Sequence, residues 1–283
     1  MAFLPAKIDQ ENWVFFNEEE TKKLGASLST EYQAGNPFPF ISIDNFLPEE
    51  ILNRVLAEFP QDFQREQKRS QELYKGHYEP DNIPAGFTRA LFYSFNSRPF
   101  LSFLEALTGI EGLIPDPYFL GGGLHETSRG GCLGIHADFN LHKKMKLHRR
   151  INVLVYLNKD WEKEYKGDLE LWSKDMKEKV HSIPPVFNRC VVFNTDDNSF
   201  HGHPDSLECP ADRTRKSIAL YYYTASDAIF SELKLRTTVF KARSNTADKF
   251  DYYIRFKYFV RDCIPPILVR AAIRLFKGNQ PRL

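Results

Sequence analysis

The sequence predicts a mainly β protein with flanking helices, folded as a sandwich or jelly roll. From about residue 115 to 225, short runs of β-branched and aromatic residues alternate with turn residues. Aromatic residues make up 14% of the chain, as is typical of packed β-rich cores. Helical spacings of apolar residues occur on either side. We therefore predict one domain over 1–283, with N-terminal helices and an entry strand at 1–114, the β core at 115–225 and a helical extension at 226–283.

The N-terminal part contains a strand and two helices. A polar stretch ends at the turn signal 35–37, and residues 38–43 then read as a short strand. The following helix starts at Pro48, with two acids in its first turn. A second amphipathic helix covers 98–109 and is closed by glycine. Between the helices, 61–86 has few apolar residues and several turn residues, which predicts a long loop.

The β core contains runs that favour strands because they are rich in β-branched and aromatic residues. The first run ends at the turn signal Asn158-Lys159-Asp160. Regular spacing of short strands is what indicates the sandwich or jelly roll. The four runs are 151–157, 168–172, 189–194 and 217–224.

Composition and charge exclude several classes of protein. The formal net charge is +1, which gives no indication of nucleic-acid binding. The four cysteines have no CxxC spacing and no disulfide framework, so we expect a reducing compartment. The N-terminus lacks the pattern of a secretory signal, and no apolar run approaches the roughly 18 residues of a membrane span. We predict a cytoplasmic protein.

His136, Asp138 and His201 are a candidate metal site. On an extended segment, residues two apart project on the same face, so His136 and Asp138 can reach one ion. A jelly roll can bring His201 back to meet them. Two imidazoles and one carboxylate are the ligands of a non-haem Fe(II) centre with open positions for oxygen. His203, two residues further on, is the alternative second histidine.

Arg215 and Ser217 follow the last candidate ligand on one strand face. The planar guanidinium of arginine binds a carboxylate through two hydrogen bonds, so Arg215 could hold an acidic co-substrate beside the metal. Ser217 could add a hydroxyl bond. Arg213 is the alternative, and a surface position in the charged loop 212–216 is the other interpretation of Arg215.

These elements together resemble the Fe(II)- and 2-oxoglutarate-dependent dioxygenases, and most of all their prolyl 4-hydroxylase type. The resemblance rests on the His136-Ala137-Asp138 triplet with His201, on 156–161 (Tyr-Leu-Asn-Lys-Asp-Trp), on 167–169 (Gly-Asp-Leu) and on Arg215-Lys216-Ser217. It extends from about 119 to 225, and 38–60 is similar to the entry strand and helix of these enzymes.

The resemblance implies a cupin-like double-stranded β-helix with iron inside its mouth. His136, Asp138 and His201 would be the ligands, and Arg215 would bind the distal carboxylate of 2-oxoglutarate. Tyr156 falls where the family lines the co-substrate pocket with a tyrosine, and the residues on its strand face, Asn152 and Leu154, would also point inward. The family often has a second tyrosine about ten residues before the first metal histidine. This chain has none there, and either His125 takes its place or His125 is an ordinary polar strand residue.

The implied reaction is hydroxylation of an unactivated C–H bond by O2, with decarboxylation of 2-oxoglutarate to succinate and CO2 and with ascorbate as a possible reductant. Halogenating relatives lack the carboxylate ligand, so Asp138 favours hydroxylation. The substrate is left open between a prolyl residue and a small amino-acid-, sugar- or lipid-derived molecule. Two other functions are open: a non-catalytic jelly-roll module that binds metal, and a cupin-like metalloenzyme that does not use 2-oxoglutarate.

Two basic segments are candidates for contact with a substrate or partner. Residues 142–150 carry His, Lys and Arg directly after the metal motif. We expect a solvated loop near the rim of the site, with attraction of an acidic substrate as the alternative. Residues 266–277 form a basic amphipathic helix, which we expect to pack on the domain, although such helices also lie on membrane surfaces. The sequence does not predict an oligomeric state.

Overall fold

The computed structural model describes residues 2–61, 71–225, 236–244, 246 and 248. They belong to one compact unit that ends at Asp248. Its elements, in chain order, are β1 (Lys7–Ile8), β2 (Val14–Phe15), α1 (Glu18–Gln33), β3 (Phe40–Ile43), α2 (Glu49–Ala57), β4 (Glu72–Tyr78), η1 (Pro80–Asn82), α3 (Phe87–Phe95), α4 (Arg98–Thr108), β5 (Ile114–Pro115), β6 (Gly123–Ala137), β7 (His148–Tyr156), η2 (Lys163–Tyr165), β8 (Leu169–Trp172), β9 (Lys179–Ile183), β10 (Cys190–Asn194), β11 (His201–His203), β12 (Thr214–Thr224) and β13 (Val239–Phe240).

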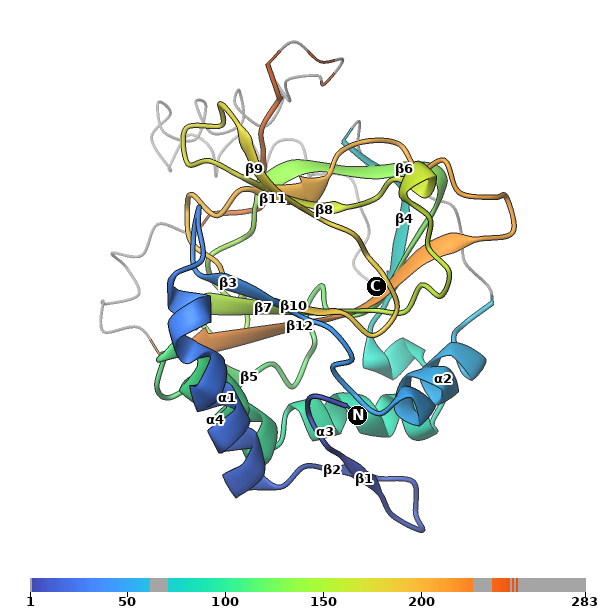
Figure 1. Cartoon of the computed structure of the whole chain (residues 1–283), viewed down its shortest axis with the longest axis vertical. Helices are drawn as coiled ribbons and strands as arrows, with labels where there is room; N and C mark the ends of the chain where they lie inside the picture. Colours follow the sequence, from blue (N-terminus) through green and yellow to red (C-terminus); the bar gives the residue numbers. More distant parts are fainter. Residues whose placement is uncertain (1, 62–70, 226–235, 245, 247, 249–283) are drawn as a thin grey trace, which may run out of the picture. The chain divides into compact units, whose positions relative to one another are not determined.

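An 11-stranded sheet folds into two facing layers (Figure 1). One layer contains β3, β10, β7 and β12 in that order, and the other contains β6, β11, β8 and β9, with β4 paired to β6. The long strand β6 joins the layers, because its first half pairs with β12 and its last residues pair with β11. This mainly antiparallel, nearly closed arrangement confirms the predicted jelly roll.

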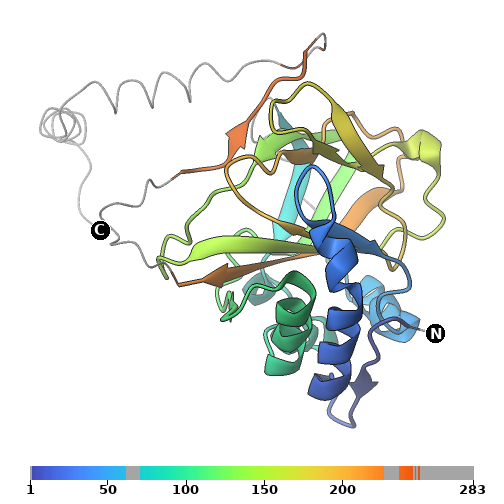
Figure 2. The ribbon, with the colours of Figure 1, turned by 60° about the vertical axis from the view of Figure 1, so that its left-hand side comes forward.

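The helices cover the outer face of the β3–β10–β7–β12 layer, where α1 and α4 lie side by side (Figures 1 and 2). Strand β7 shows how the sequence separates the two faces. Ile151, Val153 and Val155 pack into the core beneath the helices. Leu154 and Tyr156 belong to a second cluster between the layers. This alternation is the period of two that a strand imposes on its side chains.

Helix α1 lies in a region to which the sequence analysis assigns no element. Asn17 caps it, since its side chain accepts a hydrogen bond from the backbone of Glu20. The helix packs closely on α4, and a Cβ at Gly25 would lie 2.3 Å from the carbonyl oxygen of Phe103. Leu24, Leu28 and Tyr32 pack on the core from one side of the helix, at a spacing of four residues. This short apolar stripe was overlooked because it lies in a segment that is otherwise polar.

The prediction of a long loop at 61–86 is wrong at Glu72–Tyr78, which forms β4 and pairs with β6. Residues 79–86 form a loop that contains only the short η1, and helix α3 begins at Phe87. Residues 62–70 lie outside the described part. Glu72 and Lys75 of β4 face a polar cavity, so the strand lacks the alternation of apolar and polar residues that identifies a half-buried strand.

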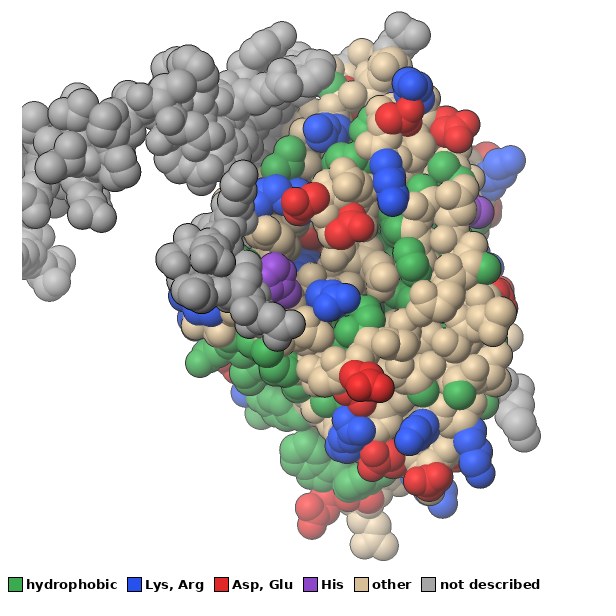
Figure 3. Space-filling view, turned by 90° about the vertical axis from the view of Figure 1, so that its left-hand side faces the viewer, with side chains coloured by type: hydrophobic (Ala, Val, Ile, Leu, Met, Phe, Trp, Pro, Cys, Tyr) green, Lys and Arg blue, Asp and Glu red, His purple; other side chains and the backbone are tan. Residues whose placement is uncertain are grey.

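Most of the predicted C-terminal extension lies outside the described residues, including the amphipathic helix at 266–277. The described stretch 236–244 contributes the short strand β13, which pairs with the end of β6. No helix of the described residues is long and apolar enough to cross a membrane. On the face shown in Figure 3, basic and acidic side chains are interspersed.

Candidate functional site

A cavity of about 260 Å3 lies between the two layers. Its wall is formed by side chains from β4, β6, β7, β8, β11, β12 and β13, so residues far apart in the sequence meet there. Its two arginines have different surroundings, because Arg149 contacts Asp138 and Arg215 contacts Gly167 and Tyr156. The residues that carry this chemistry are His125, His136, Asp138, Arg149, Asn152, His201, His203 and Arg215.

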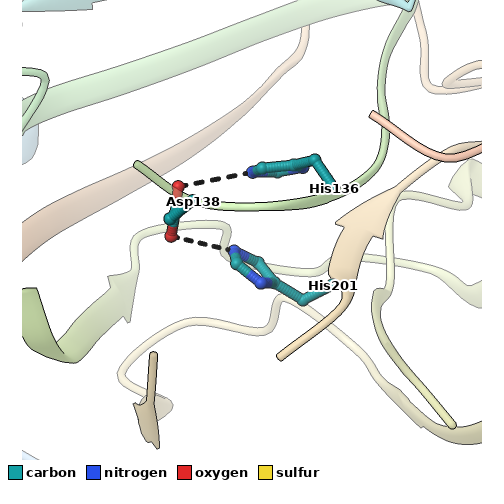
Figure 4. Close-up of side chains that lie close together, drawn as sticks. All are labelled: His136, Asp138 and His201. Carbon is teal, nitrogen blue, oxygen red and sulfur yellow. Dashed lines mark ion pairs between the residues drawn. The ribbon is translucent and has the colours of Figure 1, made fainter. Parts of the chain in front are cut away.

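Strand pairing brings His136, Asp138 and His201 together (Figure 4). His201 begins β11 and lies directly opposite His136 near the end of β6. The Nε2 atom of His136 lies 3.6 Å from one oxygen of Asp138, and that of His201 lies 3.4 Å from the other. One ligand atom from each residue lies within 4.8 Å of the others, and in the part of the chain that the structure describes no other group of three such side chains has this geometry.

Both imidazoles are oriented by their own backbone. His136 Nδ1 lies 2.9 Å from the carbonyl oxygen of Gly134, and His201 Nδ1 lies 2.9 Å from that of Ser199. A carbonyl can only accept, so each Nδ1 carries a proton, and Nε2 is the ring nitrogen that faces Asp138. Burial holds the pKa of His136 below its usual value. Rings that are fixed through Nδ1 and direct Nε2 to the same carboxylate fit the requirements of a divalent metal.

Asp138 has two partners besides the histidines. The Arg149 guanidinium lies 3.0 Å from its Oδ2 atom, and the Asn152 amide donates to the same oxygen at 2.8 Å. Burial opposes ionisation of this carboxyl, but the charge of Arg149 and the contacts with His201 and His136 outweigh it and hold the pKa well below its usual range. The carboxylate therefore has the charge that a metal ligand needs.

Arg215 is buried in a different part of the cavity wall. Its Nε donates to the carbonyl of Gly167 at 2.7 Å, and its Nη2 donates to the hydroxyl of Tyr156 at 3.3 Å. Among the described residues, no carboxylate forms an ion pair with it. A buried guanidinium with only neutral partners is suited to an anionic ligand.

Strand register places three predicted co-substrate residues side by side. Ser217 of β12 lies opposite Tyr156 of β7 on one side and opposite His125 of β6 on the other. His125 donates through Nε2 to the carbonyl of Gly121 at 3.0 Å. Burial and the charge of Lys75 hold the pKa of His125 well below its usual range, so this ring is neutral.

His203, the alternative metal ligand, is outside the group of three. It is 3% exposed, and in the described part of the chain neither ring nitrogen has a hydrogen-bond partner. Burial and the positive charges of Arg215 and Lys75 hold its pKa well below the usual value. A buried, unpartnered imidazole beside an arginine indicates a place for a ligand that accepts hydrogen bonds.

The other predicted site residues have distinct positions. Asn152 and Leu154 line the cavity, as expected from their strand face, together with Ser217. Tyr156 lies behind Arg215, whose guanidinium carbon is 5.0 Å from the centre of its ring. Arg213 donates instead to the carbonyls of Lys159 and Asp160, in a different groove of the surface.

Sequence reasoning missed Arg149, Tyr221 and Lys75 in the cavity wall. The solvated-loop prediction for 142–150 is wrong at His142 and Arg149, which are buried, whereas Lys143, Lys144 and Lys146 are exposed. Arg149 belongs to β7, three residues before Asn152, and a shift in the register of β7 with β12 between Ile151 and Arg149 interrupts the strand period of two. A basic residue inside a basic run gave no reason to expect burial.

The family comparison agrees with this geometry. Residues 122–223 match the model described as the 2OG-Fe(II) oxygenase superfamily. The matched region runs from the start of β6 to the end of β12 and contains all three candidate ligands and Arg215. No curated protein matches the chain.

Solved structures share the fold at low sequence identity. A prolyl hydroxylase from Trichoplax adhaerens, in complex with a hypoxia inducible factor oxygen degradation domain peptide fragment, is 20% identical with a TM-score of 0.51, over 72% of this chain and 91% of that one. A Pseudomonas putida prolyl-4-hydroxylase is 18% identical with a TM-score of 0.47, over 71% and 99%. A Phytophthora capsici prolyl 4-hydroxylase is 19% identical with a TM-score of 0.49, over 90% and 80%.

The jelly roll therefore encloses a cluster of two histidines and one aspartate that could hold a metal ion. Residues 122–223 are similar to the 2OG-Fe(II) oxygenase superfamily, and this matched region contains the whole cluster.

Proposed function

We propose that this chain hydroxylates an unactivated C–H bond, with Fe(II) held by His136, Asp138 and His201. The reaction consumes O2 and 2-oxoglutarate and releases succinate and CO2, and ascorbate serves as a reductant for the iron. One observation carries the proposal. A single cavity holds three free ligand atoms and, in its wall, an arginine whose partners in the described chain are all neutral.

The three proposed ligands supply two neutral nitrogens and one negative oxygen. Fe(II) bound by such a set keeps open positions for a co-substrate and O2, and supplies the oxygen activation. The protein's own contribution is geometry, because backbone carbonyls fix both rings. Leu154, Leu169 and Phe240 line the same cavity and limit the access of water.

Arg215 is the proposed anchor for the distal carboxylate of 2-oxoglutarate. The carbonyl of Gly167 and the hydroxyl of Tyr156 fix its guanidinium, so little side-chain entropy is lost when the anion binds. Ser217, His125 and His203 line the cavity as further hydrogen-bonding groups. Neutral His203 can donate through one ring nitrogen, whereas neutral His125 already donates to the carbonyl of Gly121 and can only accept through Nδ1.

The substrate is proposed to approach through a second hollow of about 460 Å3 that shares three residues with the cavity wall, Gly121, Phe139 and Thr238. Leu120 and Leu141 make part of this hollow apolar, as suits an aliphatic group. A prolyl residue of a peptide, or a small amino-acid-, sugar- or lipid-derived molecule, is the proposed substrate class. The peptide bound to the Trichoplax adhaerens enzyme is the reason to test peptides first.

The cytoplasm is the proposed compartment. Cys132, Cys190 and Cys209 are free thiols buried in the fold, which suits a reducing environment.

The decisive experiment is co-substrate turnover by the purified protein loaded anaerobically with Fe(II). We expect 2-oxoglutarate to produce a visible charge-transfer absorption, and addition of O2 to produce labelled succinate from labelled 2-oxoglutarate even without substrate. Binding without succinate would favour the non-catalytic module. Failure to bind 2-oxoglutarate would overturn the proposal and favour a metalloenzyme of the cupin type.

The substrate class is tested with isotopic oxygen. Proline-containing peptides and small-molecule mixtures are incubated with the loaded protein under 18O2, and products are analysed by mass spectrometry. We expect a product that gains one labelled oxygen atom while succinate formation rises.

A further inference from the structure

We infer that Arg149 and Asn152 form a clamp that reserves one oxygen of Asp138 and makes this residue a single-oxygen metal ligand. The inference rests on the proposed function, in that Asp138 is taken to bind the metal. Both residues are positioning residues, because they act on the metal through Asp138.

The clamp converges on one atom. Oδ2 of Asp138 lies 2.8 Å from the amide nitrogen of Asn152, which donates to it, and 3.0 Å from the Nη2 of Arg149. Because each carboxylate oxygen offers about two lone-pair sites, these two donors occupy Oδ2. Oδ1 faces the Nε2 of His136 at 3.6 Å and has neither donor. Oδ1 is therefore the oxygen left for the metal, although the Nε2 of His201 lies 3.4 Å from Oδ2.

Arg149 is itself fixed from three directions. Its Nε and Nη2 both donate to the side-chain oxygen of Asn152, at 3.0 and 2.7 Å. Its guanidinium carbon lies 3.5 Å from the ring centre of Tyr221 and 4.6 Å from that of Phe139, so the cation is held between two aromatic rings. The side chain is 1% exposed. Such a group does not adjust its position when the carboxylate moves.

Strand register explains why these residues meet. Asn152 and Tyr221 lie directly opposite one another on β7 and β12, so the ring that covers Arg149 and the amide that holds it come from paired positions. Asp138 lies one residue after the end of β6, where the carboxylate is not restrained by a strand. The clamp supplies the restraint that the backbone does not.

The consequence concerns the number of open positions on the metal. A carboxylate that binds through both oxygens takes two positions, and one that binds through a single oxygen takes one. With two histidines and a single oxygen, an octahedral ion retains three open positions, enough for a two-point co-substrate and O2. The clamp thereby protects the position that O2 needs.

Two charge-conserving variants test the clamp with Mn(II) as the probe. Arg149→Lys keeps the positive charge but loses the planar fork, and Asn152→Ala removes the amide. Arg150→Lys is the matched control, because the neighbouring arginine donates to Thr224 and does not line the cavity. The readouts are Mn(II) affinity and the water-proton relaxation of the Mn(II) complex, which reports bound water and requires neither 2-oxoglutarate nor turnover.

We expect each clamp variant to bind Mn(II) about 10-fold more weakly, as is usual when the partner of a metal ligand is removed. We expect the inner-sphere relaxation to fall by roughly a third, since two of three open positions remain when Asp138 binds through both oxygens. We expect the double variant to bind Mn(II) no more weakly than the single variant with the lower affinity, because both changes act on Oδ2. Arg150→Lys is expected to match the wild type.

Unchanged relaxation in both clamp variants would overturn the inference, whether or not the affinity falls. Thermal unfolding of the metal-free proteins identifies a variant that does not fold. In that case the relaxation of the other clamp variant decides whether the inference holds. Failure of the wild-type protein to bind Mn(II) would instead contradict the proposed function. The two failures are therefore distinguishable.

Discussion

The two parts of the cavity differ in how completely their polar groups are satisfied. Around Asp138, both imidazole Nδ1 atoms have backbone acceptors, and the carboxylate has donors from Arg149 and Asn152. Around Arg215, the ionic partner is missing among the described residues, and both nitrogens of His203 lack a partner.

The groups around Asp138 are therefore held in place before any ligand binds, whereas the groups around Arg215 gain their missing partners only when a ligand binds. Leaving a buried donor or acceptor unpaired costs roughly 1–3 kcal/mol, and more for a charge. The group of His136, Asp138 and His201, here called the metal end, avoids this cost by internal hydrogen bonds that also orient the three side chains. The Arg215 end bears the cost in the free protein, and an anion that accepts hydrogen bonds removes it. We therefore expect the affinity for metal to depend on the orientation of the ligand side chains, and the affinity for the co-substrate to depend on the positive charge of Arg215.

The largest effect is expected from removing a ligand at the metal end. His136→Ala should weaken Mn(II) binding by more than about 100-fold, because the loss of a supporting residue alone costs 10- to 100-fold. Isothermal titration of the metal-free protein measures this. The matched control is His203→Ala, which removes an imidazole from the same cavity but from outside the group of three. Equal losses in both variants would mean that His203 belongs to the metal site.

Arg215→Ala should give the next largest effect, at the other end. A charge-assisted pair contributes about 2–3 kcal/mol, so 2-oxoglutarate should bind roughly 100-fold more weakly while Mn(II) affinity is retained. Titration of 2-oxoglutarate into the metal-loaded protein measures both quantities. Arg213→Ala is the control, since Arg213 contacts the carbonyls of Lys159 and Asp160 instead. A similar loss in both variants would contradict the assignment of Arg215.

The metal end was the part that the sequence predicted best. The His136–Asp138 spacing and the inward face of β7 follow from the strand period of two, which is a local property. Arg215 was found because a strand follows it directly. In each case, neighbours in sequence were sufficient for the argument, and the fold class followed from the same regular spacing of strands.

The rest depended on contacts that the sequence does not encode locally. Strand β4 was read as a loop because Glu72 and Lys75 face a polar cavity rather than an apolar core. Arg149 was read as solvent-exposed because its burial requires Asp138 and Tyr221, which come from two other strand regions. Helix α1 was missed because its apolar stripe is short, and its closest contact with α4 is made at Gly25, which has no side chain. Polar cavities and close backbone contacts remove the periodic signal that sequence analysis uses.

His203→Leu should raise the stability of the ligand-free protein and lower its affinity for 2-oxoglutarate. The substitution replaces an unpartnered buried imidazole by an apolar side chain, so the free energy of unfolding without ligands should rise by about 1 kcal/mol. The affinity for 2-oxoglutarate should fall, because a hydrogen-bonding group is lost. Urea unfolding and ligand titration measure the two effects. Reduced stability in the ligand-free variant would show that His203 supports the fold.

The smallest expected effect is a dependence of stability on pH that arises from His125. Burial and the charge of Lys75 keep its folded-state pKa well below the value of about 6.5 in an unfolded chain. Below about pH 6.5 the unfolded chain takes up a proton that the folded protein does not, so stability is complete above this pH and falls as the pH is lowered. The slope from one such group is at most about 1.4 kcal/mol per pH unit.

His125→Gln keeps a donor for the carbonyl of Gly121 but cannot titrate. Urea unfolding of the metal-free variant at about pH 7.5 and about pH 5.5 should therefore show a smaller loss of stability than the wild type on either side of the histidine pKa. An unchanged loss would mean that His125 does not cause the dependence of stability on pH. Added 2-oxoglutarate should reduce the wild-type loss as well, because an anion bound at Arg215 offsets the charge of Lys75 that helps to keep the ring neutral.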